Sequence, residues 1–248
     1  MFKVVIPARF ASSRLPGKPL LDISGKPMVI HVADQARKSQ ADEVVIATDH
    51  EPIMQAASQY GVVSVITRAD HPSGTDRIAE VVQAMRWSDE TIVVNVQGDE
   101  PLIDPALINE VAQTLAKDAQ AVMATACHPI HDHTAFENPN IVKVVLNTKG
   151  QALYFSRAPI PYPRDAGFRE HLTAHRHIGI YAYRVGFLKQ YASLSATSLE
   201  EIESLEQLRV LYHGYQIAVT VTENAPASGV DTPADLEYVR EVFGSKQV

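Results

Sequence analysis

Short apolar runs alternate with longer amphipathic stretches along the first half of the chain, and this alternation restricts the possible folds most strongly. The apolar runs, which predict strands, lie at 4–6, 44–48, 62–66, 92–96 and 121–126. The stretches at 28–38, 52–60, 77–85 and 106–117 have the spacing of amphipathic helices. Strands that are apolar throughout are typical of a parallel sheet with helices on both faces. We therefore expect an open, mostly parallel α/β sheet of the Rossmann-like kind, with ligands bound beyond the carboxyl ends of its strands.

The pattern changes after Pro129. Two apolar runs, 141–146 and 152–156, flank the turn residues Asn147 to Gly150 and predict a hairpin, with another strand at 177–183. A charged amphipathic helix is expected at 199–212, and Thr232 is the expected N-cap of the last helix. We predict a single domain over residues 1–248, with a β-rich lobe inserted at about 129–185.

The composition limits the binding partners and the cellular compartment that we expect for the protein. A formal net charge of −7 and a pI near 5.8 argue against the basic face that nucleic-acid binding usually needs, but do not exclude a local basic pocket for a small anion. The single Cys127 rules out an internal disulfide and fits a reducing compartment. No uninterrupted apolar stretch approaches the roughly 20 residues of a membrane helix. The sequence thus predicts a soluble cytoplasmic protein, without membrane insertion and without a nucleic-acid partner.

A cluster of positive charge follows the first predicted strand, where the chain reads RFASSRLPGKPL from residue 9 to residue 20. Arg9, Arg14 and Lys18 supply the charge, and the nearby prolines prevent a regular helix. From these residues alone, the loop fits a solvated turn and a phosphate cradle equally well. The chain has neither the G-x-G-x-x-G motif of dinucleotide sites nor the P-loop motif, so neither kind of site is expected.

Two aspartates follow apolar or glycine-containing segments far apart in the sequence. Asp99 comes just after the strand predicted at 92–96, and Asp231 precedes the last helix. Carboxylates at the ligand edge of an α/β sheet can hold Mg²⁺, which often joins one or two carboxylates to substrate phosphates. The alternative for Asp99 is an acidic turn before a helix capped by Asp104, and the alternative for Asp231 is helix capping. Together with the cationic loop, the aspartates predict a phosphoryl or nucleotidyl transfer site.

A second group of metal-ligand types, Cys127 to His133, contains one cysteine and three histidines. Structural zinc sites usually draw four ligands from two separated clusters, and the sequence has no second cluster with matching spacing. We interpret this segment as a loop and not as a metal site.

Five segments resemble motifs of the 3-deoxy-manno-octulosonate (Kdo) cytidylyltransferases, the CMP-Kdo synthetases, and they occur in the same order. They are 6–20 (IPARFASSRLPGKPL), 95–101 (NVQGDEP), 177–181 (HIGIY), 203–209 (ESLEQLR) and 229–233 (GVDTP). Other sugar nucleotidyltransferases share the first-strand R…PGK loop, so a single segment is only moderately specific, whereas five in order are highly specific. The resemblance covers essentially the whole chain.

The resemblance implies a glycosyltransferase-A-like nucleotidyltransferase sheet with a smaller sugar-binding and dimerisation lobe, and a homodimer. It also implies the reaction of CTP with Kdo to give CMP-Kdo and pyrophosphate for lipopolysaccharide, with Mg²⁺ as cofactor. By this resemblance Arg9, Arg14, Lys18, Ser73 and Gln97 would bind CTP, and Asp99 and Asp231 would hold Mg²⁺. Arg77, Gln97, Arg157, His177, Tyr181 and Glu206 would line the sugar site. The catalytic residues would be Arg14, Lys18, Asp99 and Asp231.

Several of these assignments have ordinary structural alternatives. Arg77 and Arg157 also fit surface arginines, and His177 fits a structural histidine at a strand start. Glu206 lies three residues before Arg209, so the two could pair along one helix. Three other functions remain open: CMP transfer to 8-amino-Kdo or a sialic acid, a sugar-1-phosphate nucleotidyltransferase, and a non-catalytic nucleotide-binding regulator.

Overall fold

The structure is a computed structural model that describes residues 1–11, 15–71, 73–165, 174–223, 226–227 and 229–245. The chain forms two compact units. The first comprises Met1–Asn109, Arg184–Tyr191 and Pro226–Val248, and the second comprises Glu110–Tyr183 and Ala192–Ala225. The single domain with a lobe at about 129–185 stays a prediction.

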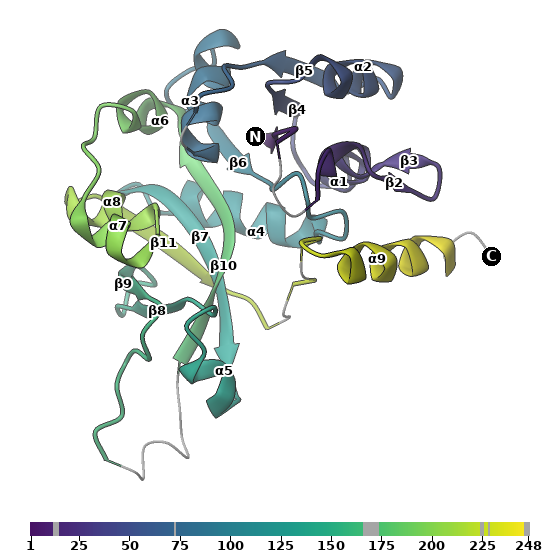
Figure 1. Cartoon of the computed structure of the whole chain (residues 1–248). Coiled ribbons are helices and arrows are strands. Elements are labelled where there is room, and N and C mark those ends of the chain that lie inside the picture. The colour runs from purple at the N-terminus through teal and green to yellow at the C-terminus, as the bar shows by residue number, and fades with distance from the viewer. Residues whose placement is uncertain (12–14, 72, 166–173, 224–225, 228, 246–248) are drawn as a thin grey trace. The chain divides into compact units, whose positions relative to one another are not determined.

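A parallel sheet forms the centre of the first unit (Figure 1). Its strands are β1 (Phe2–Ala8), β4 (Glu43–Thr48), β5 (Val63–Ile66) and β6 (Ile92–Asn95). They lie in the order β6-β1-β4-β5, and every pair is parallel. The side chains of Val4, Val5 and Ile6 in the central strand are fully buried. This arrangement confirms the predicted open, mostly parallel α/β sheet.

Helices α1 (Met28–Arg37), α2 (Glu51–Gln59) and α3 (Gly74–Ala84) connect these strands, at places that the amphipathic stretches predicted. The unit also contains α6 (Val185–Tyr191), which no predicted stretch covers, and α9 (Pro233–Ser245), the expected last helix. Helix α4 (Pro105–Lys117) spans the boundary between the units. A 3-10 turn, η1 (Lys18–Leu20), and the short strands β2 (Asp22–Ile23) and β3 (Lys26–Pro27) precede α1. Helix α3 begins three residues before the predicted start because Ser73 caps it, accepting a hydrogen bond from the backbone N–H of Asp76.

The order of the strands reverses beside β1. The chain passes from β1 outward to β4 and β5, and then returns to form β6 on the other side of β1. In open α/β sheets, ligands bind outside the carboxyl ends of the strands at such a reversal. The loops that follow β1 and β6 are therefore the expected position of a binding site.

The second unit is mostly antiparallel. It contains β7 (Ala121–Ile130), β8 (Lys143–Leu146), β9 (Ala152–Ser156), β11 (Gln216–Val221) and nearly all of β10 (Ala174–Arg184). Strand β10 pairs antiparallel with β7 and β8, β8 pairs antiparallel with β9, and β11 pairs parallel with β7. The β8–β9 pairing confirms the predicted hairpin, whose turn residue Gly150 has a φ of 75°.

The helix predicted at 199–212 is wrong as a single element. The structure has two short helices there, α7 (Ser198–Glu203) and α8 (Gln207–Tyr212), besides α5 (His133–Glu137) earlier in this unit. Ser204 adopts a left-handed conformation, with φ 52° and ψ 50°, and ends α7. The apolar spacing continues across this break, so the pattern alone could not show it. No helix of the described residues is long and apolar enough to cross a membrane.

Candidate active site

Three charged side chains from distant parts of the sequence meet in the first unit. Lys18, in η1, places Nζ 2.5 Å from Oδ2 of Asp99 and 3.1 Å from Oδ1 of Asp231. The lysine side chain is 12% exposed, whereas the two carboxylates are 35% and 49% exposed. Asp99 follows β6 and Lys18 follows β1, so two members of the cluster lie at the reversal of strand order. The structure thus brings together the cation and the two aspartates that the sequence predicted.

The backbone around the aspartates is closely packed, which fixes their positions. A Cβ on Gly98 would lie 2.7 Å from the carbonyl oxygen of Pro7, which is too close for a carbon and an oxygen atom. Only glycine, which has no Cβ, fits at this position. The backbone N–H of Val230 donates to the carbonyl of Asp99 at 2.9 Å and so joins the segment before α9 to the loop after β6. The two carboxylates are therefore held close together by main-chain contacts.

Helix capping does not account for either aspartate. Asp104 Oδ1 accepts from the backbone N–H of Ala106 at 2.9 Å, and Thr232 Oγ1 accepts from that of Asp235 at 3.2 Å. Thr232 thus caps the last helix as predicted, and neither Asp99 nor Asp231 is needed for that purpose.

The neighbouring Glu100 differs from Asp99 in its protonation. Burial, together with the negative charge of Asp99, raises the pKa of Glu100 to about 8. At neutral pH its side chain is therefore largely protonated. Among the described residues, no group of three or more His, Cys, Asp and Glu side chains could hold a metal ion. A metal at this cluster would accordingly have Asp99 and Asp231 as protein carboxylate ligands, and phosphate or water oxygens as the others.

The other predicted CTP-binding residues lie in the same unit. Arg9 is exposed directly after β1, and Arg14 lies outside the described residues. Gln97 is partly buried in the turn after β6, where its carbonyl accepts from the N–H of Glu100 at 3.2 Å. Ser73, which caps α3, also donates its hydroxyl to Asp76 Oδ2 at 2.7 Å. Its predicted contact with nucleotide stays a prediction.

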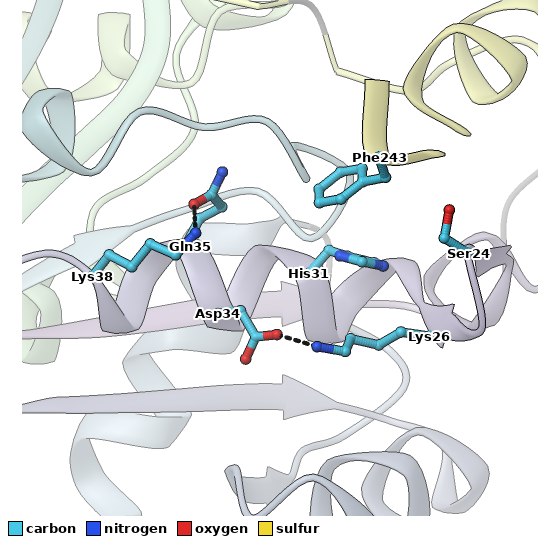
Figure 2. A pocket seen from close by; sticks show the side chains of 7 residues that line it. All are labelled: Ser24, Lys26, His31, Asp34, Gln35, Lys38 and Phe243. Atoms are coloured by element: carbon cyan, nitrogen blue, oxygen red, sulfur yellow. Dashed lines mark hydrogen bonds and ion pairs between the residues drawn. The ribbon is translucent and has the colours of Figure 1, made fainter. Parts of the chain in front are cut away.

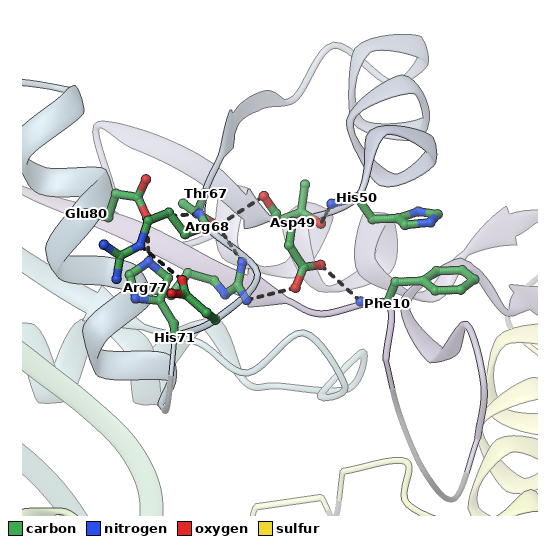
Figure 3. Close-up of polar contacts among 10 residues, drawn as sticks. Phe10, Asp49, His50, Thr67, Arg68, His71, Arg77 and Glu80 are labelled. Carbon is green, nitrogen blue, oxygen red and sulfur yellow. Dashed lines mark hydrogen bonds and ion pairs between the residues drawn. The ribbon is translucent and has the colours of Figure 1, made fainter.

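Arg77, predicted for the sugar site, is completely buried. Its Nη2 lies 3.0 Å from Oδ2 of Asp49, and its Nη1 donates to the hydroxyl of Thr67 (Figure 3). The alternative of a surface arginine is therefore wrong. Both terminal nitrogens contact protein groups, and the predicted contact with sugar stays a prediction.

The four remaining sugar-site residues lie in the second unit. His177 Nε2 is 3.0 Å from the hydroxyl of Thr125, and the ring contacts those of Phe155 and Tyr181, with centroids 4.9 and 5.4 Å away. Burial lowers the pKa of His177 to about 3, so its ring is neutral at physiological pH.

Glu206 is exposed at the N-terminus of α8. Arg209 forms a two-pronged ion pair with Glu200, at 2.7 Å from Nε and 2.5 Å from Nη2.

Arg157 is held by Glu203, the first residue of the 203–209 motif, and by Lys143, which was not predicted from the sequence. Its Nε donates to the carbonyl oxygen of Glu203 at 2.7 Å, and its backbone N–H donates to the Glu203 carboxylate at 2.9 Å. The buried ammonium of Lys143 donates to the carbonyls of Asn138, Ile141 and Arg157 at 3.0, 2.6 and 2.6 Å. Lys143 is a single charged residue within an apolar strand pattern, and this feature of the sequence could have indicated its structural role. Burial there lowers the pKa of Lys143.

A separate cavity of about 450 Å³ lies in the first unit (Figure 2). It is lined by Ser24, Lys26, His31, Asp34, Gln35, Lys38 and Phe243, none of which the sequence predicted for the site. Lys26 pairs with Asp34 at 2.6 Å, and Lys38 donates to Gln35 at 2.8 Å. Lys26 and Asp34 thus form an ion pair in the cavity wall, whereas the Lys38 ammonium is bound by a neutral amide.

The open, mostly parallel α/β sheet is that of a nucleotidyltransferase. The sequence model of the cytidylyltransferase family matches residues 3–217, and the chain belongs to this family. A solved CMP:2-keto-3-deoxy-manno-octonic acid synthetase in complex with CTP is 45% identical, with a TM-score of 0.92 over 99% of this chain and 100% of that one. Within the cytidylyltransferases, the chain is therefore a member of the CMP-Kdo synthetase family, Kdo being the same sugar acid.

A second solved structure shows the fold at greater distance. A cytidylyltransferase from Leptospira borgpetersenii serovar Hardjo-bovis (strain JB197) is 17% identical, with a TM-score of 0.63. The match covers 98% of this chain and 87% of that chain. At this identity the likeness supports the α/β fold alone.

Proposed function

We propose that this enzyme transfers the cytidylyl group of CTP to Kdo, giving CMP-Kdo and pyrophosphate, and so supplies an activated sugar for lipopolysaccharide synthesis. The observation that carries the proposal is the meeting of Lys18 with Asp99 and Asp231 at the ligand edge of the sheet. The identity of 45% to a synthetase of CMP-Kdo solved with CTP supports the choice of nucleotide and sugar.

The donor set at this cluster fits Mg²⁺. Two carboxylates already hold one cation, the Lys18 ammonium, and Mg²⁺ prefers carboxylate and phosphate oxygens. Asp99 and Asp231 would hold the metal. When bound, it would lower the charge on the α-phosphate and the pKa of the attacking hydroxyl.

The residues of the cationic loop act on the triphosphate. Lys18, together with Arg9 and Arg14, would bind its oxygens. The anomeric hydroxyl of Kdo attacks the α-phosphorus, a new P–O bond forms, and the bond to the β-phosphate oxygen breaks. Negative charge then builds up on the departing pyrophosphate, and Lys18 and Arg14 stabilise it.

The sugar acid would be recognised by Arg157, His177, Tyr181 and Glu206 of the second unit. A guanidinium binds a carboxylate through two parallel hydrogen bonds, which suits Arg157 for the Kdo carboxylate. Glu203 and Lys143 contact Arg157 and its flanking backbone, which supports a fixed orientation of this arginine. The neutral ring of His177 can exchange hydrogen bonds with a sugar hydroxyl without adding charge.

The acceptor is tested by incubating the enzyme and CTP with Kdo, 8-amino-Kdo, a sialic acid or a hexose 1-phosphate, and identifying the products by mass spectrometry. We expect CMP-Kdo as the main product. CMP-sialic acid or a nucleotide-hexose as the main product would contradict the proposal, and no product with any acceptor would favour a non-catalytic regulator.

Two further parts of the proposal concern the assembly and the location. We propose a homodimer, which sedimentation equilibrium tests: a single species of the monomer mass, 27.2 kDa, would contradict it. We also propose a cytoplasmic location, which cell fractionation tests.

A further inference from the structure

Phe10 is the point at which the cationic loop is attached to the sheet edge. Its backbone N–H donates to Oδ1 of Asp49 at 3.4 Å, and its ring stacks on that of His50 with centroids 3.9 Å apart and planes 8° apart. Asp49 and His50 directly follow β4, which pairs with β1 up to Ala8 and Thr48. The first residues of the loop are thus fixed to the neighbouring strand by a polar and an aromatic contact (Figure 3).

The same residue also closes the loop. The carbonyl of Phe10 accepts from the N–H of Gly17 at 3.3 Å, and a Cβ on Gly17 would lie 3.4 Å from the Phe10 ring. Gly17 has a φ of 67° and directly precedes Lys18. The position of Lys18 therefore depends on the contacts of Phe10, eight residues earlier.

Asp49 also forms an ion pair with a buried cation. Its Oδ2 lies 3.0 Å from Nη2 of Arg77, whose side chain is fully buried. Arg77 Nη1 donates to Thr67, and its Nε has no partner among the described residues. A buried guanidinium that contacts both a carboxylate and a hydroxyl fixes the orientation of Asp49, whose other oxygen accepts from Phe10.

We infer that Asp49 and Arg77 are positioning residues that hold Phe10 and, through Gly17, Lys18 in place for the triphosphate. This inference rests on the proposed function and deepens it. Arg77 would then act on the nucleotide site through Asp49, and its guanidinium would contact the sugar only after release from Asp49. Residues that are held in place before the ligand arrives lose less conformational entropy on binding.

The test variant is Asp49→Asn, which keeps the shape of the side chain. A carboxylate offers two acceptor oxygens, to Arg77 and to Phe10, whereas an amide offers one oxygen and two donors. Either orientation of the amide thus places a donor against a donor. The matched control is Glu80→Gln, since Glu80 lies on the same helix as Arg77 and accepts from His71 and the N–H of Arg68, away from Phe10.

Two measurements detect the effect of the Asp49→Asn substitution without requiring catalytic turnover. Calorimetry with CTP and with CMP should show that Asp49→Asn weakens CTP binding by about tenfold and CMP binding by less than about twofold, because only the triphosphate needs the loop. Amide exchange followed by NMR should be about tenfold faster at Phe10 and Gly17 in the ligand-free variant. Glu80→Gln should match the wild type in both measurements.

Phe10→Ala provides a second variant, since this side chain is 39% exposed and its removal does not disturb the core. It removes the stacking on His50, and we expect the same preferential loss of CTP binding. Equal weakening of CTP and CMP, or unchanged exchange at Phe10 and Gly17 in both variants, would overturn the inference. The exchange data stand even if no CMP-Kdo is formed, so failure of the inference and failure of the proposed function are distinguishable.

Discussion

Nζ of Lys18 lies 2.5 Å from Oδ2 of Asp99, so the loops that follow β1 and β6 are joined by an ion pair at the reversal of strand order. Asp231, from the segment before α9, is the second carboxylate on the same ammonium. The two carboxylates thus account for the placement of Lys18, one of the three cations that follow the first strand.

Asp99→Asn and Asp231→Asn should fold normally and lose turnover by at least about a hundredfold each, because each removes one of two carboxylates that would hold the metal. Turnover is measured as pyrophosphate release, and folding as the thermal unfolding midpoint. Asp104→Asn, at a helix cap, is the control and should keep its activity. Full activity in either variant would exclude a shared metal site.

Lys18→Met should separate metal binding from catalysis. The ammonium competes with a metal for Asp99 and Asp231, so without it the nucleotide-free variant should bind Mn²⁺ about tenfold more tightly than the wild type. Its pyrophosphate release should nevertheless fall by about a hundredfold or more, since the charge on the leaving group loses its partner. Electron paramagnetic resonance measures the free Mn²⁺, and Lys26→Met serves as control. Weaker Mn²⁺ binding in Lys18→Met would contradict the described geometry.

His177 should make the protein less stable as the pH falls below about 6.5. Its pKa is near 3 in the native state and near 6.5 in the unfolded chain, so the unfolded chain alone takes up a proton between these values. The free energy of unfolding of the wild type should fall more steeply than that of His177→Phe, by at most about 1.4 kcal/mol per pH unit. Urea unfolding at pH 7, 6, 5 and 4 measures both. Parallel curves would show that His177 is not desolvated.

Lys143→Met should destabilise the protein by about 2–4 kcal/mol, because it leaves three carbonyls near Arg157 without their donor. Urea unfolding measures this loss. At temperatures where the variant is folded, the KM for Kdo should rise while the KM for CTP changes little. Lys149→Met, in the exposed hairpin turn, is the control. An equal rise in both KM values would argue against a role for Lys143 in positioning Arg157.

The sequence predicted the parallel sheet and the Lys18, Asp99 and Asp231 cluster well, because both follow from local patterns. Apolar runs indicate buried strands. Charged residues that directly follow parallel strands lie at the same edge of the sheet, where the carboxyl ends of the strands meet. The break at Ser204 was not predictable, since one left-handed residue leaves the apolar spacing unchanged. The burial of Arg77 was not predictable either, because its partner Asp49 follows a different strand and nothing in the local pattern joins them.

The contacts of Arg157 were not predictable for the same reason. Lys143 and Glu203 lie on β8 and α7, and both contact Arg157 just after β9. These contacts depend on how the second unit folds, which local periodicity does not record. The hydrogen bonds around Arg157 were therefore found only in the three-dimensional structure.

Transfer of CMP from CTP to Kdo is tested by pyrophosphate release from each of the four ribonucleoside triphosphates, measured with and without Kdo in the presence of Mg²⁺. We expect release with CTP alone among the nucleotides, only when Kdo is present, and in a one-to-one ratio with the CMP-Kdo formed. Release that does not depend on Kdo, or that is equally fast with ATP, GTP or UTP, would contradict it.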